Sequence, residues 1–239
     1  MVAEINAFFE PLVREYRAYR KMERRFNEET AARFNLVGIW QPSETQVSRI
    51  LAALLDPNGP HGQGGVYLKE FVRTIRDHAR RGEAVGEAAY GQGLLDEEAL
   101  WFDRAAVRTE ETIIGARRID IYMEVPRGGG KRILIGIENK PWAGEQDAQI
   151  RDYVKGLRDR CKQIGGLGPV LLYLTADGRR PTTWSERDAD HVLCVSYPGF
   201  LKKWIEESMA ITRPDKLRNF LRDFSFWIDE NFQRLEEEG

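Results

Sequence analysis

Three charged residues in the middle of the chain have the types and spacing that metal-assisted hydrolysis requires. Asp120 lies in a segment of alternating polar and apolar residues, and Glu138 and Lys140 stand two residues apart in a second segment. Residues two apart on a strand point to the same face, so Glu138 and Lys140 are expected to project together. Two carboxylates suit Mg²⁺, which binds one or two protein carboxylates with water and phosphate oxygens. The pattern predicts that Asp120 and Glu138 bind the metal and that Lys140 positions an attacking water.

The same charges also fit an ordinary solvated strand face. Polar residues alternate with apolar ones on any half-exposed strand, and Glu–Lys pairs are frequent on protein surfaces. An Asp followed at a distance by Glu-x-Lys has low specificity as a motif. These residues alone therefore leave the catalytic and the structural interpretation open.

The surrounding segments indicate the elements that must position these residues. Asp120 is expected to lie opposite its apolar neighbours Ile119 and Ile121 on a half-buried strand, and Asn139 to face away from Glu138 and Lys140. The predicted central elements, in order, are a strand at 118–125, a hairpin at Gly128–Gly130, a strand at 133–140, a helix at 146–161, and strands at 170–175 and 192–196.

Amphipathic helices are predicted on both sides of this centre, and no internal repeat or Pro/Ser-rich linker interrupts the chain. The order of elements predicts one α/β domain over residues 1–239, with a core at approximately 40–200 and extra N- and C-terminal helices. Four flanking helices are expected: one at 4–27, one that begins at Ser43–Glu44 and stops at Pro57, one around 67–75 and one at 217–232. Residues 82–100 show no clean hydrophobic period, which predicts a loop.

Composition and charge exclude several protein classes. Hydrophobic residues make up 42% and charged residues 31% of the 239 residues, as in an ordinary globular protein. The net charge of −2 gives no general support to nucleic-acid binding, although the middle third is basic. Cys161 and Cys194 lack zinc-ligand spacing, and no apolar run approaches the ~20 residues of a membrane span. We expect a cytoplasmic protein without disulfides and without a membrane partner.

The motifs extend beyond the three charged residues. The chain contains Arg118-Ile119-Asp120-Ile121, Ile135-Gly136-Ile137-Glu138-Asn139-Lys140, Glu145-Gln146-x-x-Gln149-x-x-x-Tyr153, Ser48-Arg49-Ile50-x-x-x-Leu54-Leu55-Asp56-Pro57 and His61-Gly62-Gln63-Gly64. Over roughly residues 40–160 this set resembles the PD-(D/E)xK nuclease superfamily, in particular a bacterial branch of nuclease-like proteins. Ile119 stands where the superfamily's name has Pro, but both acids and the lysine are intact.

The resemblance implies a restriction-endonuclease-like core, in which a helix, a mixed central sheet and a second helix follow one another. It also implies a nuclease that uses Mg²⁺ or Mn²⁺ to hydrolyse phosphodiester bonds in DNA, in defence, restriction or repair. Gln149 matches the glutamine that such proteins often carry on the helix after the Glu-x-Lys strand. Glu44 matches a glutamate on the first core helix that reaches the metal waters.

Most of these further candidates also have a structural interpretation. Glu44 suits the positive end of a helix dipole whether or not it contacts a metal. Gln146, Gln149 and Tyr153 share one helix face, which fits either a catalytic cleft or an ordinary helix surface. Glu110 is a second candidate for an additional acid, or a solvent-facing strand residue.

His61, Trp142 and a group of basic residues also have both a functional and a structural interpretation. His61 could act as a general base or pack a loop. Trp142 could stack on a base or pack at the rim. The basic residues near the hairpin fit either a phosphate contact or a solvated face, and they are Arg117, Arg118, Lys131 and Arg132.

Two other functions stay open at this point. The chain could be a catalytically inactive nucleic-acid-binding or protein-interaction module, which the acidic C-terminal third and the long flanking helices suit, for example as a homodimer. It could also be a nuclease directed at RNA rather than DNA, because the metal site is indifferent to the sugar. No helix-turn-helix or zinc finger is evident, so weak sequence reading is expected.

Overall fold

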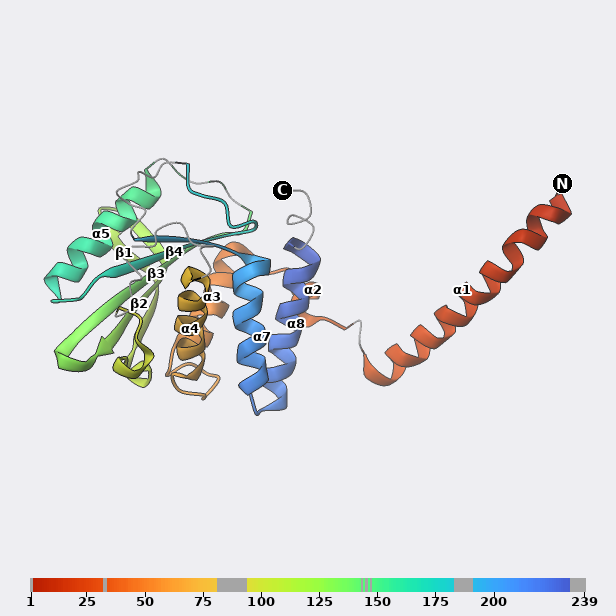
Figure 1. Cartoon of the computed structure of the whole chain (residues 1–239), viewed down its shortest axis with the longest axis horizontal. Coiled ribbons are helices and arrows are strands. Elements are labelled where there is room, and N and C mark those ends of the chain that lie inside the picture. Colours follow the sequence, from red (N-terminus) through yellow and green to blue (C-terminus); the bar gives the residue numbers. More distant parts are fainter. Residues whose placement is uncertain are drawn as a thin grey trace.

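The computed structural model describes residues 2–31, 34–80, 94–142, 144, 146, 148–182 and 191–232. Its centre is one five-stranded mixed sheet with strand order β1-β2-β3-β4-β5 (Figure 1). The first three strands are antiparallel, and β3, β4 and β5 run parallel. The strands are β1 (Ala106–Ile114), β2 (Arg117–Arg127), β3 (Lys131–Lys140), β4 (Pro169–Thr175) and β5 (Val192–Ser196).

Helices cover both faces of this sheet. The α5 helix (Gln149–Gln163) packs on one face, where its apolar side chains join Ile119, Tyr122 and Leu134 in one buried cluster. A larger cluster on the opposite face joins Ile121 and Ile135 to the remaining helices of the body. Those helices are α2 (Leu36–Trp40), α3 (Glu44–Leu55), α4 (Val66–Arg80), α7 (Lys202–Ile211) and α8 (Asp215–Phe232).

The remaining elements are short, apart from the first helix. α1 (Val2–Thr30) extends away from the rest of the chain in Figure 1. None of the helices in the described part of the chain combines the length and apolarity needed to cross a membrane. The short elements are the 3₁₀ turns Glu97–Ala99, Phe102–Arg104 and Gly128–Gly130 and the π-helical turn Tyr197–Leu201.

The structure confirms the predicted α/β class and its order of helix, mixed central sheet and helix. It corrects two local predictions. The strand carrying Asp120 is covered on both faces rather than half-buried, because α5 packs over Tyr122 on the side expected to face solvent, where Glu124 is buried as well. The predicted helix at 146–161 begins at Gln149, because Ala148 has a left-handed backbone with φ of 55°. The predicted loop at 82–100 lies largely outside the described residues.

Gly156 sets the depth at which α5 packs against the sheet. A β-carbon at this position would overlap the side chain of Ile113 on β1. The absence of a side chain therefore lets α5 approach β1 closely, and α5 carries Gln149 and Tyr153 at its first turns. The position of those two side chains depends on this close contact.

Replacing Gly156 with Ala should lower the free energy of unfolding by about 1–2 kcal/mol, because an overpacking cost of about 2–3 kcal/mol exceeds the ~1 kcal/mol that Ala gains in helix propensity. Urea denaturation measures the change. Gly128→Ala is the control, because a β-carbon there meets open space; it should change stability by less than about 0.5 kcal/mol. Equal stability of Gly156→Ala and the wild type would contradict this packing role.

Candidate active site

Asp120 lies where the ladder between β2 and β3 ends. The last residue pair of that ladder is Ile121 with Ile137, and beyond it the Asp120 Oδ2 atom accepts the backbone N–H of Asn139 at 2.8 Å. Ile119 packs on the α5 face of the sheet, whereas Ile121 packs on the opposite face. The prediction that both isoleucines share one face is therefore wrong. The regular alternation of side chains between the two faces of β2 is interrupted at Asp120. The carboxylate takes the place of a ladder acceptor instead of pointing squarely to one face.

Strand β1 is irregular at the same level. Thr109 pairs with Ile121 and Glu111 pairs with Ile119, while Glu110 between them has a left-handed φ of 53°. The Glu110 carboxylate lies 3.4 Å from the guanidinium of Arg118. The irregularity in β1 accompanies the change of face in β2.

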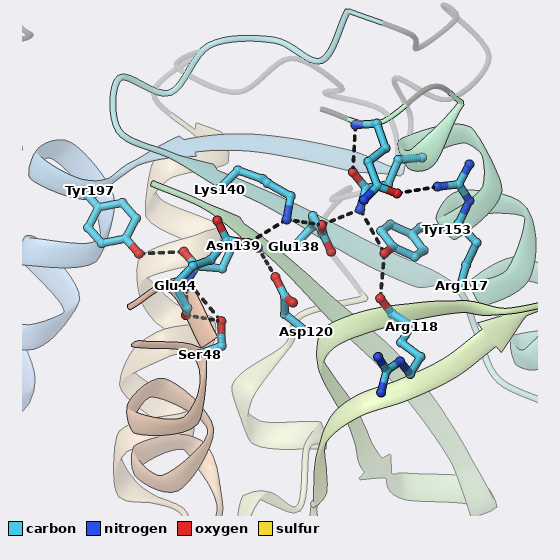
Figure 2. A network of polar contacts seen from close by, with 12 residues as sticks. Glu44, Ser48, Arg117, Arg118, Asp120, Glu138, Asn139, Lys140, Tyr153 and Tyr197 are labelled. Atoms are coloured by element: carbon cyan, nitrogen blue, oxygen red, sulfur yellow. Dashed lines mark hydrogen bonds and ion pairs between the residues drawn. The ribbon is translucent and has the colours of Figure 1, made fainter. Parts of the chain in front are cut away.

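Glu138 and Lys140 project together from the end of β3, as their two-residue spacing predicts. The Lys140 Nζ atom lies 3.0 Å from Glu138 Oε1 and 2.7 Å from Glu44 Oε1 (Figure 2). Glu44 is the first residue of α3, whose start is fixed by a reciprocal capping box between Ser43 and Gln46. One ammonium group is therefore held between a carboxylate of β3 and a carboxylate of α3.

The first turns of α5 hold Glu138 from the other side. The Gln149 amide donates to Glu138 Oε1 at 2.7 Å and to the Tyr153 hydroxyl at 3.1 Å. Tyr153 in turn donates to the backbone carbonyl of Arg118 at 2.6 Å. Gln146, predicted to share this helix face, precedes the helix, and its backbone N–H donates to Gln149 Oε1 at 3.2 Å. Glu145 of the same predicted motif lies outside the described residues.

Asn139 faces away from this group, as predicted, and joins β3 to two helical elements. Its side-chain amide donates to Ser48 Oγ at 3.0 Å and to the Glu44 carbonyl at 3.3 Å. The Tyr197 hydroxyl donates to Asn139 Oδ1 at 2.6 Å. These bonds fix the first turn of α3 on β3 and so set the place of Glu44. Tyr197 is missed by sequence reasoning, because nothing in its local pattern links it to Asn139.

A cavity of about 410 Å³ brings most of the predicted residues together. Asp120, Glu138, Lys140 and Gln149 all line it, whereas Glu44 reaches it through Lys140. Arg117 and Arg118 add positive charge to the lining. The other lining residues are Glu110, Ala116, Gln146 and Tyr153.

Burial and mutual repulsion change the ionisation of these acids. Burial raises the pKa of Asp120 to about 6, partly offset by the Asn139 N–H and by Lys140. Burial and then the nearby Asp120 carboxylate raise the pKa of Glu138 to about 8. Burial lowers the pKa of Lys140, but Glu138 and Glu44 outweigh this and raise it above its ordinary value. The protein therefore holds a charged ammonium beside two carboxyl groups that retain protons unusually well.

The two acids retain unused ligand atoms. Glu138 Oε2 is buried without a hydrogen-bond partner among the described residues. Asp120 uses Oδ2 for Asn139, and no hydrogen bond to its Oδ1 is found in the described part of the chain. A divalent cation would satisfy both oxygens and neutralise their repulsion, so these residues fit one. No group of three or more His, Cys, Asp or Glu side chains suited to a metal occurs within the described ranges.

Other candidates lie in structural roles or away from the cavity. The His61 ring accepts from the Gln63 N–H and contacts the Asp56 carbonyl, which fits loop packing. Trp142 is half-exposed, and its ring packs near the ring of Phe232. The predicted grouping of four basic residues is wrong: Arg117 and Arg118 line the cavity, whereas Lys131 and Arg132 begin β3 at the opposite end of that strand.

The raised pKa values make the metal-free protein less stable as pH rises. Both carboxyl groups bind protons more tightly in the folded state than in the unfolded chain, where their pKa values are 3.8 and 4.5. Stability should therefore fall as pH rises from about 4 to about 8. Glu138→Gln has no proton to lose, so at pH 8 in EDTA it should melt roughly 2–4 °C above the wild type, which corresponds to about 1 kcal/mol. Circular dichroism melts across this pH range measure the effect.

Glu28→Gln is the control for this measurement, because the Glu28 side chain is 62% exposed on α1 and lies outside the cavity. It should keep the pH slope of the wild type. A slope for Glu138→Gln as steep as that of the wild type would show that burial of this carboxyl carries no such cost.

Comparison with known proteins agrees with this geometry. No curated protein and no solved structure was found to match the chain. A family model described as the PD-(D/E)XK nuclease superfamily matches residues 33–225, which include the whole sheet and every residue of the cavity. Because this match covers well over half of the 239 residues, the chain belongs to the PD-(D/E)XK nuclease superfamily.

Proposed function

We propose that this protein is a deoxyribonuclease that requires Mg²⁺ or Mn²⁺ and cleaves phosphodiester bonds. Membership of the superfamily indicates a nuclease in general. The observation that carries the finer proposal is the cavity in which Asp120, Glu138 and Lys140 meet, with two carboxylate oxygens unused. We further propose a single nuclease domain over residues 1–239 and a role in defence, restriction or repair.

In this proposal Asp120 and Glu138 hold the metal ion. A bound Mg²⁺ or Mn²⁺ supplies Lewis acidity toward the phosphate and lowers the pKa of a bound water. Gln149 orients Glu138, since its amide donates to Oε1 and leaves Oε2 to face a ligand. Glu44 is proposed to act through Lys140, whose Nζ it holds at 2.7 Å; contact with metal-bound water is the other role proposed for it.

Lys140 is proposed to donate hydrogen bonds rather than to accept a proton. The two neighbouring carboxylates keep its pKa above the ordinary value, so the ammonium stays charged at neutral pH. A charged donor at this place can orient an attacking water and offset negative charge on the phosphate. The proton released by the water therefore goes to another acceptor, such as a phosphate oxygen or bulk solvent.

Arg117 and Arg118 are proposed to contact the nucleic-acid backbone at the cavity. Arg117 is held by Asp152 at 3.0 Å and by Gln146 Oε1 at 3.1 Å, which limits the directions in which it can reach. Arginine is well suited to phosphate because its planar group can donate two parallel hydrogen bonds. Such contacts read the backbone and not the bases, so weak sequence preference is expected.

Incubation of the purified protein with supercoiled plasmid, linear duplex and single-stranded RNA tests the substrate. We expect cleavage of DNA with Mg²⁺ or Mn²⁺ and none with EDTA, measured by gel electrophoresis. Cleavage of RNA alone would replace the DNA proposal with an RNA-directed nuclease. No cleavage of either polymer under any metal condition would favour the inactive binding module.

Substitutions separate the proposed roles. Lys140→Ala should lower the cleavage rate at least about 100-fold. Its metal affinity, measured by calorimetry with Mn²⁺, should stay equal or become tighter, because a nearby positive charge is removed. Asp120→Ala and Glu138→Ala should lose both metal binding and cleavage. Loss of metal affinity in Lys140→Ala would contradict this assignment.

Two controls accompany these variants. Glu111→Ala removes a carboxylate of β1 that pairs with Arg108 outside the cavity, and it should retain metal binding and cleavage. Asn139→Ala should spare metal binding but lower stability by about 1–3 kcal/mol, because Tyr197 and Ser48 lose a buried partner. If Asn139→Ala loses the metal while Glu138→Ala keeps it, the assignment of the two strand faces is wrong.

A further inference from the structure

The first helix presents a long apolar stripe that nothing in the described part of the chain covers. Figure 1 shows α1 projecting from the body. Large apolar side chains recur every three or four residues along one face, as on a helix that packs against another helix. All are about half or more exposed: Phe8 70%, Leu12 54%, Tyr16 62%, Tyr19 57%, Met22 64% and Phe26 58%.

This helix needs a partner to be stable. An apolar surface of this length is uncommon on a protein that is alone in water. Pro11 lies inside the helix, where it removes a backbone hydrogen bond and costs about 3 kcal/mol. Helices in water obtain most of their stability from packing of an amphipathic face. The helical state of α1 therefore requires a surface that covers its stripe.

The order of residues along the stripe indicates what that surface is. From Phe8 to Phe26 the stripe contains Phe, Leu, Tyr, Tyr, Met and Phe, which is nearly the same in both directions. If two copies of α1 lie antiparallel, Phe8 of one copy meets Phe26 of the other and Leu12 meets Met22. Tyr16 meets Tyr19 at the centre. Residues of similar size are then opposite one another along the whole contact, as a two-fold interface requires.

The charges of α1 favour the same direction. Residues 2–13 contain two acidic residues and no Lys or Arg, whereas residues 14–25 contain six basic and two acidic residues. In the antiparallel pairing above, residues 2–13 of one copy, with net charge −2, face residues 21–32 of the other, where Lys21, Arg24 and Arg25 balance Glu23, Glu28 and Glu29. Basic residues then face their own copies only over 14–20, where the net charge is +2. A parallel pair would set the two basic segments side by side, where like charges repel.

We propose that α1 forms an antiparallel helix pair with α1 of a second copy and so makes this protein a homodimer. The six large apolar side chains of the stripe have roughly 100 Å² each to bury, which gives about 1,200 Å² in the pair. That area reaches the lower end of the range for stable, specific interfaces. The dimer stands independently of the proposed nuclease activity, because none of its contacts involves the cavity.

The stripe suits a lipid surface less well. Glu15 and Glu23 lie on the apolar side, three or four residues from Leu12, Tyr19 and Phe26. A negatively charged membrane would repel these carboxylates. In a helix pair, each of these carboxylates can pair with an arginine beside the contact, as Glu23 already does with Arg20 at 3.2 Å.

Sedimentation equilibrium of the full chain tests the interface. We expect a dimer, and expect the double variant Leu12→Gln, Tyr16→Gln to raise the dissociation constant at least about 100-fold, because four apolar side chains leave the interface. The matched control, Arg17→Gln with Lys21→Gln, changes the opposite face with the same helix propensity and should shift the constant less than about fivefold. Melting temperatures of both variants confirm that the body remains folded.

Disulfide trapping tests the direction. Phe8→Cys and Phe26→Cys, each made separately, should cross-link when mixed and not when oxidised alone. The natural cysteines Cys161 and Cys194 are buried, and the wild type controls for them.

Three results would overturn the proposal. The first is a monomeric wild type, whether or not it sediments with anionic vesicles. The second is a dimer whose dissociation constant is unaffected by the Leu12 and Tyr16 substitutions. The third is self-cross-linking of either single cysteine variant. Because none of these measurements uses nucleic acid or metal, their failure is distinct from failure of the nuclease proposal.

Discussion

The burial of Glu138 beside Asp120 is the constraint on which the rest of the site depends. A carboxylate that is 1% exposed, with one oxygen unpartnered, is costly in a protein interior. The surrounding elements reduce this cost without removing it. Lys140 supplies a positive charge at 3.0 Å, and Gln149 supplies a hydrogen bond at 2.7 Å. The remaining oxygen and the raised pKa keep this region less stable than an apolar core, which is typical of functional sites.

The fold brings the required groups together at one end of β2 and β3. Lys140 is the last residue of β3, and Asp120 lies just beyond the last pair of the β2–β3 ladder. The N-terminal residues of α3 and α5 both reach this end, one from each face of the sheet, with Glu44 and Gln149 as their first residues. Two separate hydrophobic clusters fix these helices on the sheet. One cluster therefore positions Glu44, which holds Lys140, and the other positions Gln149, which holds Glu138.

Much of this arrangement could be predicted from local patterns. The shared face of Glu138 and Lys140 follows from strand periodicity, and the start of α3 follows from the capping residues Ser43 and Gln46. The change of face at Asp120 could not be predicted, because alternation assumes a regular strand and the carboxylate itself replaces a ladder acceptor. The grouping of Arg117 with Lys131 was wrong because it ignored the length of the strand between them. Lys131 pairs with Arg127 beside the hairpin, and the eleven-residue strand β2 separates Arg127 from Arg117 by about 33 Å.

Asn139 connects these observations, because it stands between Glu138 and Lys140 in the sequence while its side chain points away from the cavity. Its backbone N–H holds Asp120, and its side chain holds Ser48, the Glu44 carbonyl and Tyr197. One residue thus fixes the carboxylate of β2 through its main chain and the first turn of α3 through its amide. The Glu-x-Lys pattern assigns no catalytic role to the residue between Glu138 and Lys140. Its side chain can therefore be chosen for packing. In this chain an asparagine uses that freedom to fix the first turn of α3 on β3, and this places Glu44 beside Lys140.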